Sequence, residues 1–365
     1  MIARIAAFVL TVAFGLSQAA AGLFDDTPAP KGPPAAKPSP EQPSNAPTGD
    51  GIEIPGMEDL KEAPALGGKD PAPTGDFAQG VEAYRKNEFA KAREHWHVVA
   101  EQKHPEGSHN LGVIYEHGRG TPKDEAAAAG WYRIAADLGV PEAMNNLGRL
   151  YARGRGVPKD EVEAVRWLTA AAEADFPPGQ FNLGIAYLAG RGVKQSDPAA
   201  AHWFLKAAEA GYAPAQFNMG GLYYAGRGVE RDRAKAAHWF QAAAKQHDRG
   251  ALYNLGLLRY RGVGVAKDPA QAAKNIREAA DMGLAPAQNQ IGVMLANGDG
   301  VKRDPGAAYR WFLIAARGGD AKAKRNADAV KAALDAETRR RAEAAAKSFK
   351  PKPPPAPPTV ATRQH

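Results

Sequence analysis

A segment of 36 residues recurs six times between Asn110 and Gly300, and it constrains the fold more than any other feature of the sequence. One glycine, here called the frame glycine, marks the same phase of every copy: Gly112, Gly148, Gly184, Gly220, Gly256 and Gly292. A fixed period of this length is typical of stacked repeats, in which each unit buries its apolar face against its neighbours. We therefore expect an all-α solenoid of helix pairs rather than separate compact domains.

The first helix of each repeat contains the frame glycine. Asn-Leu or a close variant precedes this glycine, and Tyr follows three residues later in the first four copies. These positions fall on one side of a helix at 100° per residue. Six residues after the frame glycine a Gly-x-Gly turn begins, as in Gly118-Arg119-Gly120. Glycine in the left-handed conformation ends helices at little steric cost, so we expect the first helix to end there.

The second helix of each repeat follows an acidic residue that can cap its N-terminus: Asp124, Asp160, Asp232, Asp268 and Asp304. In the third repeat Ser196 takes this position and Asp197-Pro198 follows, so we expect that helix to start one residue later. Tryptophan lies nineteen residues after five of the frame glycines: Trp131, Trp167, Trp203, Trp239 and Trp311. An aromatic residue locked to the period is expected to fill the space between helices.

The segments on either side of the repeats differ from them in composition. We expect residues 76–107, with Trp96, to form a helical capping unit, because a terminal repeat has a neighbour on one side only. Residues 322–350 are expected to form a basic capping helix that runs to about Lys347. Residues 22–75 are rich in Pro, Ala and Gly and are predicted to be a disordered tether, and residues 351–365 a Pro-rich tail.

Residues 1–21 have the features of a secretory signal. Arg4 precedes an apolar stretch from Ile5 to Leu16, and small residues around Ala19 and Ala21 offer cleavage sites. This predicts a periplasmic or secreted bacterial protein. The sequence has no cysteine, so disulfides cannot contribute to its stability.

The net charge of +7 lies at the C-terminal end of the sequence. Residues 321–365 contain eleven Lys and Arg and four Asp and Glu. The rest of the sequence has equal numbers of basic and acidic residues. This distribution argues against a basic groove for nucleic acid along the repeats. Arg339, Arg340 and Arg341 are expected either to lie on a solvated helix or to make a weak contact with an anionic membrane surface.

Asn-Leu-Gly-x-x-Tyr-x-x-Gly-x-Gly-Val-x-x-Asp-x-x-x-Ala-x-x-Trp resembles the Sel1-like repeat, a relative of the tetratricopeptide repeat. The second copy, from Tyr151 through Gly154 and Asp160 to Trp167, shows the pattern in full. The resemblance implies a right-handed α-solenoid that acts as an adaptor or scaffold for other proteins. It also implies roles in envelope signalling or assembly, since bacterial members are often exported.

Motifs for catalysis, cofactors and metals are weak in this sequence. The Gly-Arg-Gly turns follow helices rather than strands, which argues against dinucleotide binding, and no cofactor is expected. Five of nine histidines lie between residues 95 and 117, but the His95–His97 and His109–His117 spacings do not place two ligands together on a helix, so we expect no metal site. No catalytic residue is predicted.

Three positions on the first helix lie opposite the apolar seam and vary between repeats. They are three before, one after and four after the frame glycine, and in the middle repeats they are mostly aromatic or aliphatic. These residues are the predicted partner-binding surface: Phe181, Ile185, Leu188, Phe217, Tyr224, Tyr253, Leu257 and Tyr260. The same side chains can instead pack between adjacent repeats, and their exposure decides between the two interpretations.

The sequence therefore predicts an exported, monomeric, non-enzymatic scaffold that binds a protein or peptide on the concave side of the solenoid. A sensor subunit that restrains a membrane kinase is a variant of this prediction. The alternative is an envelope enzyme or cell-wall ligand protein. It would require polar groups that converge in the groove, and the candidates are His109, Glu116, Asn145 and Arg149.

Overall fold

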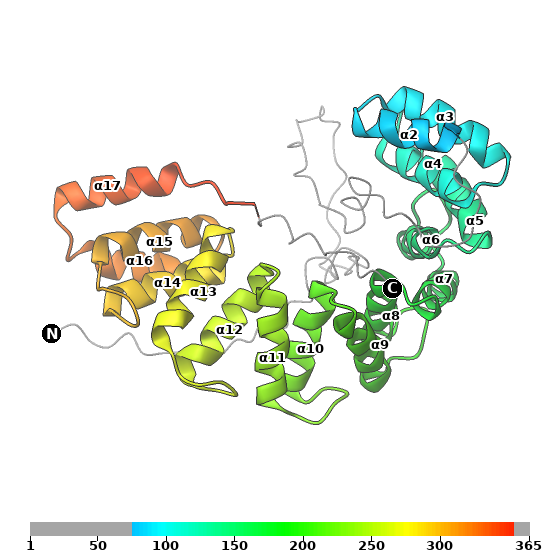
Figure 1. Ribbon diagram of the computed structural model, residues 1–365. Helices are drawn as coiled ribbons and strands as arrows, with labels where there is room; N and C mark the ends of the chain where they lie inside the picture. The colour runs from blue at the N-terminus through cyan, green and yellow to red at the C-terminus, as the bar shows by residue number, and fades with distance from the viewer. Residues whose placement is uncertain (1–74, 354–365) are drawn as a thin grey trace, which may run out of the picture. The chain divides into compact units, whose positions relative to one another are not determined.

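The computed structural model describes residues 75–353, and all regular structure in that range is α-helical (Figure 1). The described residues form sixteen helices, most of which pack on the helix that follows them. The bounds are α2 (Gly75–Arg85), α3 (Phe89–Glu101), α4 (Pro105–His117), α5 (Glu125–Asp137), α6 (Pro141–Arg153), α7 (Glu161–Glu173), α8 (Pro177–Ala189), α9 (Asp197–Glu209), α10 (Ala213–Ala225), α11 (Arg233–Ala244), α12 (Arg249–Arg261), α13 (Pro269–Asp281), α14 (Ala285–Asn297), α15 (Pro305–Arg317), α16 (Ala321–Lys331) and α17 (Ala336–Lys347). The predicted all-α repeat fold is confirmed.

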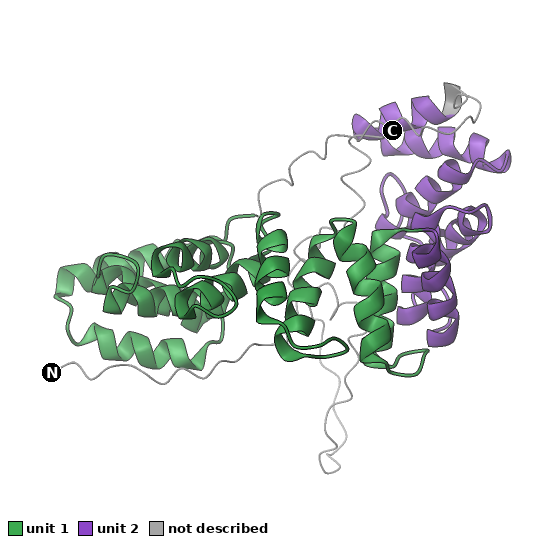
Figure 2. Cartoon of the chain, turned by 60° about the horizontal axis from the view of Figure 1, so that its bottom comes forward, with its two compact units in different colours: residues 1–20, 175–365 green, residues 21–174 purple. Residues whose placement is uncertain are grey.

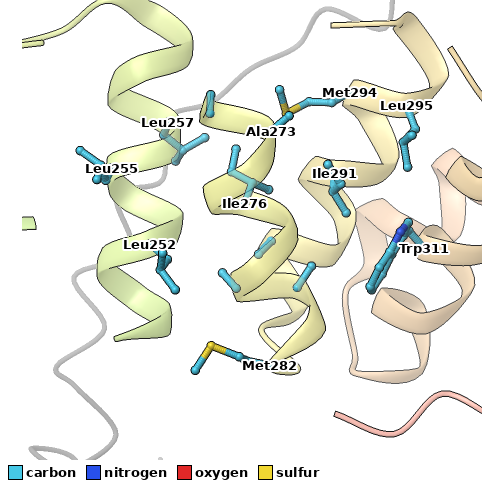
Figure 3. Close-up of a cluster of buried hydrophobic side chains, with 14 of the residues drawn as sticks. Leu252, Leu255, Leu257, Ala273, Ile276, Met282, Ile291, Met294, Leu295 and Trp311 are labelled. Carbon is cyan, nitrogen blue, oxygen red and sulfur yellow. The ribbon is translucent and has the colours of Figure 1, made fainter. Parts of the chain in front are cut away.

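The protein divides into two compact units between Ala174 and Asp175 (Figure 2). The N-terminal unit contains α2 to α7, and the C-terminal unit contains α8 to α17. Each unit has its own apolar clusters. In the C-terminal unit, Leu252, Ile276 and Ile291 come from three consecutive helices and are almost fully buried (Figure 3).

The predicted helix ends are confirmed. Each first helix of the six repeats is followed by a glycine in the left-handed conformation: Gly118, Gly154, Gly190, Gly226, Gly262 and Gly298. Asp160 accepts hydrogen bonds from the backbone N–H groups of Val162 and Glu163, which are donors that the first turn of α7 cannot satisfy itself. Asp124, Asp232, Asp268 and Asp304 cap their helices in the same way.

The expected late start of the second helix in the third repeat is wrong. Helix α9 begins at Asp197, in phase with the other repeats, and Ser196 is its N-cap. The Ser196 hydroxyl accepts a hydrogen bond from the Ala199 N–H at 3.3 Å. A serine caps a helix about as well as an aspartate, so a start one residue later, with Asp197 as the cap, would not make the helix more stable.

The frame glycine is required because a large side chain of the second helix lies directly on it. A Cβ atom on Gly220 would lie 2.6 Å from Cδ1 of Phe240, and one on Gly184 would lie 2.7 Å from Cε1 of Phe204. The residue twenty positions after each frame glycine fills this space, and it is large in every copy: Tyr132, Leu168, Phe204, Phe240, Ile276 and Phe312. These six residues are at most 2% exposed.

The periodic tryptophans contribute less to the core than the sequence predicts. Trp311 and Trp167 are buried, but Trp131, Trp203 and Trp239 are only partly buried. They lie one residue before the position that packs on the frame glycine. One step along a helix is a turn of about 100°, so the two neighbouring side chains cannot face the same space.

Adjacent repeats are joined through the Gly-Arg-Gly turns. Gly156 lies so close to the start of α5 that a Cβ atom would be 2.0 Å from the carbonyl oxygen of Glu125. Arg155 then donates to the Glu125 carboxylate, with Nη2 at 2.6 Å from Oε1. Arg227 makes the equivalent ion pair with Asp197 at 2.8 Å. The turn arginine thus recognises an acidic residue at the first position of the preceding second helix.

The Arg155–Glu125 pair makes stability sensitive to acid. Hydrogen bonds from Arg155 and Lys123 lower the pKa of Glu125 from 4.5 to about 2. The stabilisation is therefore present above pH 4.5 and is lost as the pH falls towards 2. Because the pair is partly open to solvent, we expect Glu125→Gln to cost about 1 kcal/mol at neutral pH.

Urea unfolding of wild type and Glu125→Gln at pH 7 and at pH 2.5 checks this expectation. The difference between the two proteins should shrink at the lower pH. Glu94→Gln is the control, since Glu94 is exposed and forms no ion pair with a described residue. An equal loss in both variants at pH 7, or a difference that does not change with pH, would contradict the assignment.

The C-terminal cap consists of two helices, and the single helix predicted to run to Lys347 is wrong. Helix α16 ends at Lys331, and α17 begins after Asp335, whose carboxylate accepts from the Thr338 N–H and hydroxyl at 2.7 and 2.8 Å. This local cap competes with continuation of the helix. Helix α17 packs on α15.

The first residues of the predicted Pro-rich tail are held against the repeats. The Lys352 N–H donates to the carbonyl oxygen of Asp281 at 2.9 Å, and its Nζ lies 3.3 Å from Oδ2 of the same residue. Phe349 packs its ring on Trp311, with 5.6 Å between centroids. The predicted signal peptide, nearly all of the tether and residues 354–365 of the tail lie outside the described residues.

Candidate functional site

The eight residues of the predicted partner-binding surface lie on the first helices of the C-terminal unit. Three of them are buried: Phe181 is 2% exposed, Ile185 1% and Leu257 4%. The prediction that these three face a partner is corrected. Phe181 packs on Phe204 of its own repeat and on Tyr212, the N-cap of the next first helix, with ring centroids 5.5 and 5.4 Å apart.

The position three before the frame glycine serves packing between repeats as well. The Phe217 ring lies 5.8 Å from that of Phe240, and a Cβ atom on Gly250, at the start of the next first helix, would lie 2.9 Å from Phe217. Helix α10 contacts α9 of the preceding repeat and α11 of its own, so two of its sides are covered. Phe217 nevertheless keeps part of its surface exposed.

Five of the predicted residues keep partial exposure and form what we call the first-helix surface: Leu188, Phe217, Tyr224, Tyr253 and Tyr260. They come from α8, α10 and α12. Burial raises the pKa of Tyr253 to about 12, and Asp320 adds to this effect. The Tyr260 hydroxyl donates to Asp299 Oδ2 at 3.0 Å. The surface therefore combines aromatic faces with neutral hydroxyl groups.

A pocket opens beside this surface between α10 and α12. It is shallow and partly open to solvent, and its walls are mostly apolar. The lining residues are Tyr224, Phe240, Asn254, Leu257, Leu258, Arg261 and Val263. Leu257 is almost fully buried, and it thus contributes a wall of the pocket rather than an exposed contact.

Asn254 is a pocket residue that the sequence did not single out. It occupies the Asn position that recurs in the repeats, and a residue that recurs with the period is expected to have a structural role. At the same position Asn218 donates to the Pro214 carbonyl oxygen at 2.8 Å, whereas the Asn254 amide makes no hydrogen bond with a described residue. A side-chain amide both donates and accepts, so it can bind the backbone of an extended peptide.

The polar residues of the alternative prediction are brought together in the N-terminal unit, around Glu116. Glu116 is 3% exposed, and its Oε2 accepts a hydrogen bond from the Tyr132 hydroxyl at 2.8 Å. Arg149 and Arg155 approach Glu116 Oε1 at 3.9 and 3.8 Å. His109 has a different partner from the arginines: its Nε2 lies 3.4 Å from the amide nitrogen of Asn146.

Burial changes the protonation of two groups of this polar cluster. Burial lowers the pKa of His109 to about 4, so the imidazole is neutral at physiological pH. Burial, with Glu116 beside it, raises the pKa of Tyr132 well above its ordinary value. Arg149 donates to the Asn146 side chain at 2.9 Å and is largely buried. Asn145 is buried as well.

The remaining predictions concern metals and membranes. Within residues 75–353, no three His, Cys, Asp or Glu side chains gather as metal ligands would. His97 instead lies 3.1 Å from the Tyr115 hydroxyl. None of the described helices has the length and apolarity needed to cross a bilayer. Arg340 and Arg341 are exposed on α17, and their contact with an anionic surface stays a prediction.

Comparison with known proteins agrees with the repeat geometry. The Sel1 repeat profile matches residues 105–140, 141–176, 177–212, 213–248, 250–284 and 285–320. The structure is similar to a Sel1 repeat protein from Oxalobacter formigenes, with 28% identity, a TM-score of 0.59, and coverage of 66% of this chain and 96% of that one. No curated protein matches the sequence.

Two other solved structures are similar to this protein with TM-scores below 0.5. The c5321 protective antigen of uropathogenic Escherichia coli has 24% identity and a TM-score of 0.41, covering 75% of this chain and 83% of that one. The immunity protein Pa5087 of Pseudomonas aeruginosa has 25% identity and a TM-score of 0.38, covering 56% and 76%. The six successive matches show that this protein belongs to the Sel1 repeat family, whose members are generally non-enzymatic scaffolds for protein–protein interaction.

Proposed function

We propose that this protein is an adaptor that binds a peptide segment of a partner protein on the first-helix surface of its C-terminal unit. The pocket between α10 and α12 supports this proposal more than any other observation. An apolar side chain of the peptide would enter between Tyr224 and Leu257, and Asn254 would bind the peptide backbone. Groove binding of this kind combines an apolar anchor with main-chain hydrogen bonds.

The partly exposed aromatic residues extend this contact to either side of the pocket. Tyr and Phe provide large contact areas for a small loss of side-chain entropy, and such residues dominate binding energy at interfaces. Leu188 lies on α8, in the repeat before the pocket, and Phe217 lies on α10, which forms one wall of the pocket. Tyr260 contacts Asp299 of the following repeat. The peptide would therefore cross more than one repeat.

Removal of one pocket wall should weaken peptide binding strongly. We expect Tyr224→Ala to reduce the affinity of a peptide selected from a random library against the full-length protein by about tenfold or more. Asn254→Ala should cost a smaller factor, about three- to tenfold, because it removes hydrogen bonds rather than apolar contact.

Fluorescence anisotropy with the labelled peptide measures both effects. Lys274→Ala is the matched control, because Lys274 is exposed on α13 and forms no hydrogen bond or ion pair with a described residue. Selected peptides that bind the Tyr224→Ala, Asn254→Ala and Lys274→Ala proteins with the same affinity as wild type would refute the proposed site.

We also propose that the adaptor acts outside the cytoplasm. The apolar stretch from Ile5 to Leu16 and the small residues that follow it support cleavage near Ala19 or Ala21. Expression in a bacterial host should yield a periplasmic protein whose N-terminus, read by mass spectrometry, begins shortly after one of these residues. A full-length protein that stays in the cytoplasmic fraction would contradict export.

A further inference from the structure

We propose that the arginine cluster of the N-terminal unit, formed by Arg149, Arg153 and Arg155 around Glu116, binds a carboxylate of a partner polypeptide. The carboxylate would come from an acidic side group or from the C-terminal end of that polypeptide. This site lies in a different unit from the pocket between α10 and α12, and it does not depend on that pocket.

The repeat geometry brings the three arginines together. Arg149 and Arg153 are four residues apart on α6 and are therefore neighbours on one face of the helix. Arg155 follows at the centre of the Gly154-Arg155-Gly156 turn, which is fixed by the left-handed conformation of both glycines. The sequence pointed to Arg149 alone, because the turn arginine recurs in the first four copies and belongs to the repeat pattern.

Glu116 does not accept hydrogen bonds from the arginine N–H groups near it. Its distances of 3.9 Å to Arg149 and 3.8 Å to Arg155 are too long for hydrogen bonds, and its close partner is the Tyr132 hydroxyl. Arg155 directs Nε and Nη2 to Glu125 and leaves Nη1 towards Glu116. Each guanidinium has five N–H donors, so the cluster has more donors than acceptors.

Arg153 gives the strongest indication of a ligand site. Its Nε atom is buried and has no hydrogen-bond partner, and its guanidinium forms no ion pair with a described residue. Burial, together with the charges of Arg149 and Arg155, lowers the pKa of Arg153 to about 10. Buried donors in folded proteins are almost always satisfied, so the unpartnered Nε–H of Arg153, close to like charges, indicates that an acceptor is missing.

The cluster favours a carboxylate over a phosphate. Lys123 also contacts Glu125, at 2.7 Å, so basic groups outnumber carboxylates in this part of the unit. A carboxylate is a single charge with two coplanar oxygens, which match the two parallel N–H donors of a guanidinium.

The test titrates the full-length protein with simple probes and follows the arginine Nε–H signals by NMR. The probes are a blocked tetraglutamate peptide, which carries only side-chain carboxylates, and an acetylated tetraglycine with a free C-terminus. Inorganic phosphate and a blocked tetraglutamine peptide complete the set. We expect one or both carboxylate probes to shift the Arg153 signal, and the glutamine peptide to leave it unchanged.

Variants separate this site from general charge attraction. Arg153→Ala should weaken binding of the carboxylate probe by about tenfold, and Arg153→Lys, which keeps the charge but loses Nε, by a smaller factor. Arg166→Ala, at an exposed arginine of α7, should change nothing. Comparison of the two carboxylate probes tells a side-chain carboxylate from a C-terminal one. No shift at millimolar probe, equal losses in Arg153→Ala and Arg166→Ala, or tighter binding of phosphate would overturn the proposal.

Discussion

Gly220→Ala should lower the free energy of unfolding of the C-terminal unit by about 1–3 kcal/mol, although alanine is normally the better helix former. The added methyl would lie 2.6 Å from the Phe240 ring, which is 2% exposed and cannot move away without displacing its own neighbours. The clash therefore exceeds the gain of about 0.5–1 kcal/mol that Gly→Ala brings in an open helix.

Gly130→Ala is the matched control for this prediction. Gly130 is an exposed residue of α5, and no atom lies within 4 Å of the position of its Cβ. Thermal unfolding should show a lower melting temperature for Gly220→Ala and an unchanged or slightly higher one for Gly130→Ala. Equal effects of the two substitutions would contradict the packing of the second helix on the frame glycine.

A second substitution at Phe240 can test the mechanism itself. Phe240→Leu alone should cost stability, because it shortens a buried residue. Combined with Gly220→Ala, the total loss should be smaller than the sum of the two single losses, since the smaller leucine leaves room for the new methyl. Additive losses in this double-mutant cycle would mean that the two residues do not interact.

Glu116→Gln should destabilise the N-terminal unit by about 2–4 kcal/mol at low salt. The substitution keeps the size of the residue but removes the carboxylate that lies 3.9 Å from Arg149 and 3.8 Å from Arg155. It also weakens the hydrogen bond from Tyr132, because a neutral acceptor replaces a charged one. The arginines, of which Arg149 is largely buried and Arg155 is partly exposed, would then repel one another.

Thermal unfolding at two salt concentrations measures this effect. The loss for Glu116→Gln should be smaller at high salt, where counter-ions screen the arginines. Glu173→Gln is the control, because Glu173 is exposed on the same unit and forms no ion pair with a described residue. An unchanged or raised melting temperature for Glu116→Gln would show that the cluster does not need its carboxylate.

The repeat fold could be predicted from sequence because its determinants are local. Asp160 caps α7 and Gly154 ends α6 through contacts within a few residues, and such contacts follow directly from residue type and spacing. The break before Asp335 is equally local, yet the decay of the repeat pattern in that segment predicted one continuous helix. The Asp335–Thr338 capping pair was the signal that could have located the break.

The exposure of the first-helix residues could not be predicted from one helix alone. The 100° rule places Phe181 and Leu257 opposite the apolar seam, but neighbouring elements cover both of them. The Tyr212 ring packs on Phe181, and α12, which carries Leu257, packs on both α11 and α13. Of the eight predicted residues, five keep partial exposure, and binding of a partner to them stays a prediction.

The arginine cluster shows the same limit. Glu116 and Arg149 could be recognised because they are polar residues at the variable positions of the first helix. Arg155 belongs to the repeated Gly-Arg-Gly turn, and Arg153 lies at neither the variable positions nor the turn. Their convergence depends on contacts between α4 and α6 across a repeat boundary, which sequence spacing does not report.

NMR of the full-length protein with ¹³C-labelled tyrosine rings, recorded with and without a selected peptide, tests most directly whether the first-helix surface binds a partner. We expect the signals of Tyr224, Tyr253 and Tyr260 to shift on binding, whereas those of Tyr84 and Tyr309, which are buried elsewhere, should stay unchanged. Shifts that spare the first three tyrosines while the peptide is bound would contradict the proposed binding surface.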